Sequence, residues 1–274
     1  MVPGTMFVFH SIANAMTSTT LAAPALLDAL VPLIRDAGRV IMDIYATDFD
    51  VTQKGDDSPV TQADQRAEDV ILAGLAQIAP GVPVVAEEAV AAGKIPVVAE
   101  RFFLVDPLDG TKEFISRNGE FTVNIALIEQ GRPVLGLVYA PAIGRLFGGV
   151  AGHGAWLEED GKGRRAIQAR QEPVAGLTVV ASRSHGDETA LDAFLAGRKV
   201  ASRTNAGSSL KLCLVAAGEA DVYPRLGRTM EWDIAAGDAV LRAAGGKVVV
   251  VADGHDLGYG KPGWDNPHFA AWGA

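Results

Sequence analysis

The chain has 274 residues, a formal net charge of −9, and hydrophobic residues at 49% of its positions. This apolar content supports one large or two modest packed domains and excludes a disordered chain. The acidic balance argues against a general basic surface for nucleic acid or anionic lipid. An anionic ligand must therefore be met locally, by a few basic residues or by metal ions.

Two further features of the sequence bear on cellular location. The single Cys213 excludes an internal disulfide and a cysteine-based zinc site, which is typical of a reducing cytoplasm. No stretch approaches the roughly 20 apolar residues that cross a bilayer. The short apolar cluster 6–9 has no basic start, so we interpret residues 1–23 as a flexible N-terminal extension rather than an export signal. We expect a cytoplasmic protein with no membrane span and no nucleic-acid partner; peripheral attachment to the inner membrane and a homodimer stay open.

The first periodic pattern along the sequence is helical. Apolar residues at helical spacing predict one long amphipathic helix over 24–47. A second helix is expected to begin near Thr61, whose side chain can cap it, and to end before Pro80. Strands are then expected in "PVVAEE", in "RFFLVD", twice in "FTVNIALIEQGRPVLGLVYAP", and as a hairpin around "FGGVAGHGAW".

Strands and helices alternate after a polar turn over 158–165. The expected elements are a strand at "LTVVAS", a helix over 208–217, a helix from near Asp233 to Gly245, and a strand at "KVVVV". This order predicts an α+β half over 24–160 and an α/β half over 161–274, packed as one unit.

Carboxylates stand where the apolar segments stop. The positions are Asp64, Glu87, Glu88, Asp106, Asp109 and Asp233. Each acid alone is more often a helix cap or a solvated loop charge. Strand ends and helix starts are, however, where α/β proteins gather ligands. Continued strand alternation would point Glu88 away from Glu87, so Glu88 ranks below it.

The adjacent acids in "VDPLDGTKEF" predict a cation site. Asp106 and Asp109 would repel each other in a site of low dielectric unless a positive charge lay between them. Mg²⁺ takes carboxylate oxygens together with substrate phosphate. Gly110 would let the backbone approach a phosphate, and the Thr111 hydroxyl could hold a water. Walker A, GxGxxG, HExxH and GxSxG motifs are missing from the sequence, which removes the usual support for nucleotide-driven motors, dinucleotide enzymes, zincins and serine hydrolases.

Four motifs in order carry a resemblance to a known family. "VTQADQ", "AEE", "DPLDGT" and "WDIAAG" together resemble the lithium-sensitive, Mg²⁺-dependent inositol monophosphatase superfamily over residues 27–269. "DGTKEFISRNGEFTVNIALI", "ASRSH" and "GSSLKLCLVAAGEADVYPR" look like its 3'(2'),5'-bisphosphate nucleotidase branch, the CysQ type, in which a lysine follows DGT. Ala86 departs from the glycine or serine of many relatives. The resemblance implies a mixed α+β and α/β fold, a layered αβαβα sandwich.

The resemblance also implies roles for individual residues. Glu87, Asp106 and the Leu108 carbonyl would hold a first Mg²⁺; Asp106, Asp109 and Asp233 would hold a second, with Glu87 available to a weaker third ion. The implied catalytic residues are Glu87 and the dyad of Asp64 and Thr111, which orients and deprotonates the attacking water. The implied substrate contacts are Leu108, Asp109, Gly110, Thr111, Lys112, His185, Ser208, Lys211, Arg225 and Asp233.

The implied activity is hydrolysis of the 3'-phosphate of 3'-phosphoadenosine 5'-phosphate to AMP and phosphate, in sulfur assimilation and nucleotide recycling. Two alternatives stay open. One is a phosphatase of the same fold that acts on inositol monophosphate or a sugar bisphosphate. The other is a non-catalytic binding or regulatory protein on this fold, for which a lost metal carboxylate or a basic face is expected.

Overall fold

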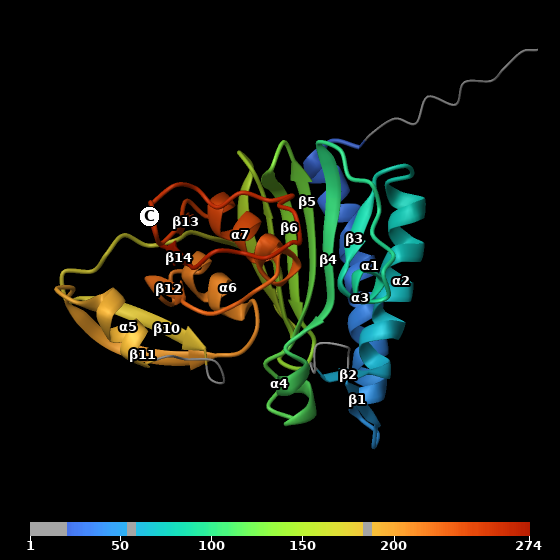
Figure 1. The fold of residues 1–274 in the computed structure, drawn as a ribbon, viewed down its shortest axis with the longest axis horizontal. Helices are drawn as coiled ribbons and strands as arrows, with labels where there is room; N and C mark the ends of the chain where they lie inside the picture. The colour runs from blue at the N-terminus through green and yellow to red at the C-terminus, as the bar shows by residue number, and fades with distance from the viewer. Residues whose placement is uncertain (1–20, 54–58, 183–187) are drawn as a thin grey trace, which may run out of the picture.

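The computed structural model describes residues 21–53, 59–182 and 188–274. Its elements form five layers in the order helix, sheet, helix, sheet, helix (Figure 1). This is the αβαβα arrangement expected from the sequence. Of the predicted N-terminal extension, residues 1–20 lie outside the described residues, so its character stays a prediction.

The first helical layer comprises α1 (Ala23–Tyr45) and α2 (Gln62–Ile78), joined through the small hairpin of β1 (Val51–Gln53) and β2 (Pro59–Thr61). Both helices bury their apolar stripes against one face of the large sheet, as the predicted periodicity requires. Thr61 caps α2, as predicted, because its side chain accepts the N–H of Ala63.

The large sheet has seven strands that follow one another in chain order. They are β3 (Val84–Ala86), β4 (Arg101–Asp109), β5 (Thr122–Glu129), β6 (Arg132–Ala140), β7 (Arg145–Val150), β8 (Gly154–Glu159) and β9 (Arg165–Ile167). Neighbours are antiparallel except β3 and β4, which are parallel. The expectation that β4 ends at Asp106 is wrong. The strand continues to Asp109, because a bulge accommodates Pro107 without ending the pairing with β5.

Two short helices follow β3 and β4. The first is α3 (Glu87–Ala91) and the second is α4 (Thr111–Ile115). The expected strand alternation at Glu88 is also wrong, because β3 ends at Ala86 and the chain turns at once into α3. The N–H of Glu88 instead donates to Glu68 Oε2 at 2.8 Å, which ties α3 to α2.

The smaller sheet has five strands in the order β11, β10, β12, β14, β13. Their bounds are β10 (Leu177–Ser182), β11 (Val200–Ala206), β12 (Val222–Arg225), β13 (Lys247–Val250) and β14 (Phe269–Trp272). Helix α5 (Glu188–Leu195) covers its outer face, with Leu191 and Leu195 packed against the strands.

Helices α6 (Leu210–Ala216) and α7 (Glu231–Ala243) lie between the two sheets and form the central layer (Figure 1). Helix α7 lies so close to β6 that a Cβ on Gly136 would come within 2.3 Å of the Ala236 carbonyl oxygen. Cys213 is buried in this layer, as expected of a core thiol. In the described parts of the chain, none of the helices is long and apolar enough to cross a membrane.

Candidate active site

The parallel pairing of β3 and β4 brings two predicted acids to one edge of the large sheet. Ala86 lies opposite Val105, so Glu87 and Asp106 follow next on neighbouring strands. Asp106 is buried, and its Oδ1 accepts the N–H of Leu108 at 3.0 Å. The carboxyl ends of parallel strands are a usual place for ligands.

The bulge in β4 turns Asp106 and Asp109 to the same face of the sheet. In a regular strand, residues three positions apart point to opposite faces. Here Asp106 lies opposite Asn124 and Asp109 lies opposite Thr122, and these two residues of β5 share a face. The extra residue in β4 has therefore shifted the alternation by one position. A local irregularity brings the two aspartates together.

Gly110 lets two loops meet beside these acids. Its φ of 90° lies in the left-handed region, which glycine adopts without strain. A Cβ there would also lie 3.3 Å from the Cβ of Ser208 and 3.2 Å from Glu113 Oε2. Glycine thus permits both the turn from β4 into α4 and the close approach of the chain before α6.

Asp64 and Thr111, far apart in the chain, are in contact. The Thr111 hydroxyl donates to Asp64 Oδ1 at 3.2 Å, and it also lies 3.5 Å from the Leu108 carbonyl oxygen. The other oxygen, Asp64 Oδ2, accepts the backbone N–H and the hydroxyl of Thr61, each at 2.8 Å. The capping box of α2 therefore fixes the carboxylate that Thr111 touches.

Three partly buried acids influence one another electrostatically. Asp233 lies in the first turn of α7, where its Oδ2 accepts the N–H of Met230 at 2.9 Å. Burial, followed by the nearby carboxylates of Asp109 and Glu87, raises the pKa of Asp233 well above its usual value. Burial likewise raises the pKa of Asp109 to about 6, against the opposing effect of the Lys211 ammonium. The region carries an excess of negative charge.

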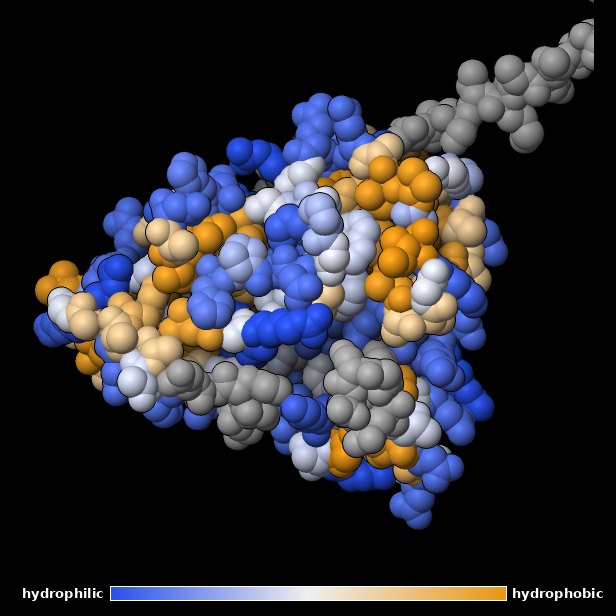
Figure 2. Space-filling view, in the orientation of Figure 1, coloured by the Kyte–Doolittle hydropathy of each residue, from blue (hydrophilic) through white to orange (hydrophobic). Residues whose placement is uncertain are grey.

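Several of these residues line a pocket of about 250 Å³. Figure 2 shows hydrophilic residues at the middle of the face that is turned to the viewer, in the orientation of Figure 1. The predicted site residues along its wall are Glu87, Asp109, Gly110, Thr111, Lys112, Ser208, Lys211, Arg225 and Asp233. Asp64, Asp106 and Leu108 are buried and do not line it. His185 lies outside the described residues, and its role stays a prediction.

Two cations on the wall have different surroundings. Lys211 is buried, and its Nζ donates to the carbonyl oxygens of Ser208 at 2.6 Å and Ala206 at 3.3 Å; burial lowers its pKa to about 8. Arg225 donates from Nη2 to the Arg228 carbonyl at 2.7 Å. Its Nε is buried and has no hydrogen-bond partner among the described residues.

Sequence reasoning missed a set of polar residues behind the acids: Thr122, Asn124 and Ser209. All three are almost completely buried. A signal was present in "FTVNIALI", where polar residues occupy alternate positions of an otherwise apolar strand. Because a buried polar side chain must find partners, such a pair indicates a hydrogen-bonded network.

The donor set suits a divalent cation. Among the residues that the structure describes, His, Cys, Asp and Glu side chains nowhere form a group of three or more arranged as a metal site. The acids nevertheless offer only oxygen donors, which Mg²⁺ prefers. Burial is the main cause of the raised pKa of Asp109 and of Asp233, and neighbouring carboxylates add to it. A cation that moved these carboxylates together would relieve their repulsion.

Comparison with known proteins shows the family of this chain. Residues 24–269 match the inositol monophosphatase family. The chain belongs to this family. It is 50% identical over 225 residues to the 3'(2'),5'-bisphosphate nucleotidase CysQ of Salmonella typhimurium, covering 81% of this chain and 89% of that protein. It is 49% identical over 239 residues to the protein of the same name from Escherichia coli K12, covering 86% and 92%.

A solved structure agrees with these relatives. The crystal structure of CysQ from Bacteroides thetaiotaomicron, a bacterial member of the inositol monophosphatase family, superposes with a TM-score of 0.75 at 37% identity. The match covers 91% of this chain and 97% of that one. The family resemblance and the fold class predicted from the motifs are confirmed. The inositol monophosphatase family is generally metal-dependent.

Proposed function

We propose that this protein is a Mg²⁺-dependent phosphatase that hydrolyses the 3'-phosphate of 3'-phosphoadenosine 5'-phosphate, giving AMP and phosphate. Identity of 49–50% over most of the chain to nucleotidases of this name carries the proposal. The reaction would serve nucleotide recycling in sulfur assimilation. A same-fold phosphatase for inositol or sugar phosphates has less support, because these relatives share the nucleotidase name.

The metal-ligand proposal rests on the acids around the pocket. Glu87, Asp106 and the Leu108 carbonyl would hold one Mg²⁺, and Asp106, Asp109 and Asp233 a second. When bound, such ions acidify water and offset negative charge on the transferring phosphoryl group. The acids alone would repel a phosphate, so an acidic pocket in a chain of net charge −9 needs this compensation.

Thr111 and Asp64 are suited to position the attacking water. Since the Thr111 hydroxyl donates its proton to Asp64 Oδ1, its lone pairs can accept a hydrogen bond from water. As the water oxygen bonds to phosphorus, its proton can pass through Thr111 towards Asp64; the bond from phosphorus to the 3'-oxygen breaks, and this oxygen takes a proton from solvent water to give the 3'-hydroxyl of AMP. The hydrogen bonds from Thr61 to Asp64 Oδ2 hold the carboxylate so that its other oxygen, Oδ1, faces Thr111.

Substrate contacts would come from both halves of the chain. Gly110, Thr111 and Lys112 border the pocket from one side, and Ser208, Lys211 and Arg225 from the other. Arg225 Nε is a donor without a partner among the described residues, and it suits a phosphate oxygen. Lys211 adds positive charge to the wall even though carbonyl oxygens hold its Nζ.

A substrate panel tests the proposal. Phosphate release would be measured with 3'-phosphoadenosine 5'-phosphate, inositol 1-phosphate and fructose 1,6-bisphosphate, each with Mg²⁺, with EDTA, and with Mg²⁺ plus Li⁺. We expect kcat/KM for the nucleotide to exceed the others by at least about 100-fold, because the other substrates leave polar groups of the pocket unpaired. Activity should require Mg²⁺ and fall with Li⁺.

Other outcomes separate the alternatives. A preference for inositol 1-phosphate or the sugar bisphosphate would overturn the nucleotide assignment and keep the phosphatase. Binding of the nucleotide without hydrolysis of any substrate, in protein that binds Mg²⁺, would favour a non-catalytic role.

A further inference from the structure

A chain of buried polar side chains connects the smaller half of the protein to the acids of the pocket. Thr122 and Asn124 are fully buried on β5, and Ser209, just before α6, is 2% exposed. The Thr122 and Ser209 hydroxyl oxygens lie 2.8 Å apart. Ser209 Oγ also donates to Asn124 Oδ1 at 2.8 Å. These contacts join residues that are more than eighty positions apart in the sequence.

The donors in this hydrogen-bonded network all point from Thr122 through Ser209 to Asn124. Ser209 has one hydroxyl proton, which goes to Asn124 Oδ1, so Thr122 must be the donor in its contact with Ser209. Because its oxygen faces Ser209, the Asn124 amide turns its NH₂ group the other way. That group lies 3.5 Å from Asp109 Oδ2 and 3.5 Å from the backbone carbonyl oxygen of Asp233.

Asn124 therefore touches both elements that bring the proposed metal ligands together. Asp109 ends β4, and Asp233 lies in the first turn of α7. The Asn124 amide group thus lies between Asp109 and the start of α7 and faces both. Buried donors directed at Asp109 restrict where the oxygens of this carboxylate point.

Ser209 holds the same carboxylate a second time. Its backbone N–H donates to Asp109 Oδ2 at 2.6 Å. The preceding residue, Ser208, has a φ of 42°, a left-handed conformation that is strained for a residue with a Cβ. Lys211 Nζ holds this turn by its bond to the Ser208 carbonyl at 2.6 Å. The turn is thus held in the one geometry that directs the Ser209 N–H at Asp109.

We propose that Asn124 and Ser209, with Thr122 behind them, are positioning residues that hold Asp109 and the start of α7 at the spacing that Mg²⁺ binding requires. The inference rests on the proposed function, because it takes Asp109 and Asp233 as metal ligands. Partners that orient metal ligands typically contribute 10–100-fold to metal affinity or activity. The loss of Mg²⁺ affinity should be largest for Asn124, smaller for Ser209 and smallest for Thr122, which lies farthest from Asp109 in the network.

The test measures cation affinity without turnover. Mg²⁺ and Mn²⁺ titrations of the full chain by calorimetry, with Mn²⁺ binding also followed by electron paramagnetic resonance, would compare wild type with Asn124→Leu, Ser209→Ala and Thr122→Val. We expect affinity to fall about 10–100-fold for Asn124→Leu and about 10-fold for Ser209→Ala. Thr122→Ser, which keeps the hydroxyl, should bind as wild type does.

Thr178→Val supplies a matched control. Thr178 is a threonine of the smaller sheet whose hydroxyl accepts from Arg170, away from the acids. This variant should lower thermal stability without changing cation affinity, which separates a general loss of a polar contact from positioning. Circular dichroism and thermal denaturation would establish folding. If Asn124→Leu does not fold, Ser209→Ala and the Thr122 pair carry the comparison.

The outcomes are distinct. Wild-type affinity, within twofold, in folded Ser209→Ala and Asn124→Leu overturns the inference and leaves the proposed function standing. A wild-type protein that binds neither Mg²⁺ nor Mn²⁺ overturns the metal-dependent function itself. A graded loss of affinity with rescue by Thr122→Ser supports the positioning role.

Discussion

Helix α7 carries two aspartates, Asp233 and Asp238, whose surroundings are opposite in charge. Asp233 is partly buried in the first turn, where burial, followed by the carboxylates of Asp109 and Glu87, raises its pKa. Asp238 is fully buried in the middle of the helix and faces a guanidinium and a phenol. The residue type and the helix are the same, and the neighbours differ.

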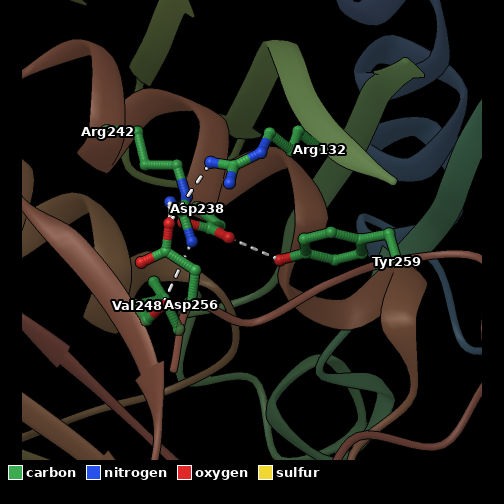
Figure 3. A network of polar contacts seen from close by, with 6 residues as sticks. All are labelled: Arg132, Asp238, Arg242, Val248, Asp256 and Tyr259. Carbon is green, nitrogen blue, oxygen red and sulfur yellow. Dashed lines mark hydrogen bonds and ion pairs between the residues drawn. The ribbon is translucent and has the colours of Figure 1, made fainter. Parts of the chain in front are cut away.

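Figure 3 shows how completely Asp238 is paired. Its Oδ1 accepts from Arg242 Nε at 2.7 Å and its Oδ2 accepts from the Tyr259 hydroxyl at 2.8 Å. Arg242 also donates to the Val248 carbonyl at 3.1 Å and to Asp256 at 3.3 Å, which Arg132 contacts from β6. Burial raises the pKa of Asp238 to about 6, although Arg242 and Tyr259 act in the opposite direction.

The different surroundings of Asp233 and Asp238 indicate how a structural carboxylate can be distinguished from a functional one. A buried charge with its own partners ties elements together, and removing one partner leaves the other uncompensated. An acid whose pKa is raised by burial and by neighbouring acids has an incompletely balanced charge, and such groups cluster at functional sites. Each half of this comparison can be tested.

The largest expected effect is on turnover. Asp233→Asn removes one carboxylate and keeps the side-chain shape, so Mg²⁺-dependent phosphate release should fall by at least about 100-fold. The metal-free protein should keep its thermal stability, because a like-charge repulsion is lost. Activity assays and thermal denaturation in EDTA would measure the two effects. Asp106→Asn should behave in the same way, and near-normal turnover in either folded variant would reject its ligand assignment.

The next effect is on stability alone. Asp238→Ala leaves Arg242 without its buried partner, and we expect the free energy of unfolding to fall by about 3 kcal/mol. Turnover per folded molecule should stay within about twofold, since Asp238 does not line the pocket. Urea denaturation and active-site-normalised kinetics would measure these quantities. Wild-type stability would show that the pairing in Figure 3 contributes little.

A pH titration of the metal-free protein sharpens the comparison. The folded-state pKa of Asp109, about 6, lies above the usual carboxyl value, so the protonated form favours folding. This contribution is present at low pH and is lost as pH rises through about 6. The melting temperature in EDTA should therefore be lower at pH 7.5 than at pH 5, by about 3–6 °C.

Adding Mg²⁺ distinguishes the contribution of Asp109 to the melting temperature from that of Asp238. A cation that binds the folded protein should raise the melting temperature at pH 7.5. The pKa of Asp238 is also raised to about 6, but Asp238 does not line the pocket, so Asp233→Asn should reduce the stabilisation by Mg²⁺ whereas Asp238→Ala should leave it unchanged. A melting temperature at pH 7.5 that Mg²⁺ leaves unchanged would contradict the site.

The smallest effect concerns one hydrogen bond. Tyr259→Phe removes the phenol from Asp238 Oδ2 and leaves the Arg242 pair in place. We expect a loss of about 1–2 kcal/mol in the free energy of unfolding, with unchanged turnover per folded molecule. Urea denaturation would measure it. A loss as large as that of Asp238→Ala would mean that the phenol, rather than the guanidinium, stabilises the aspartate.

Local sequence determined a good deal of this molecule. The cap of α2 at Thr61, the apolar stripe of α1 and the strands around "FTVNIALIEQGRPVLGLVYAP" all follow from rules that span a few residues, and the structure confirms them. The motifs also predicted the family and the layered fold. Short motifs identify the acids of the candidate site, because each acid lies within a few residues of a glycine or a strand end in the sequence.

Only the tertiary structure decided how those acids are oriented and what faces them. The β4 bulge, the turn into α3 at Glu87, and the contact of Ser209 with Asn124 depend on pairing between segments far apart in the sequence. Asp233 and Asp238 look alike in the sequence, but Asp109 at the end of β4 lies near Asp233, whereas Tyr259 from the segment before β14 joins Arg242 of the same helix at Asp238. The reason is physical: burial and neighbouring charge set the behaviour of a carboxylate, and long-range packing sets both.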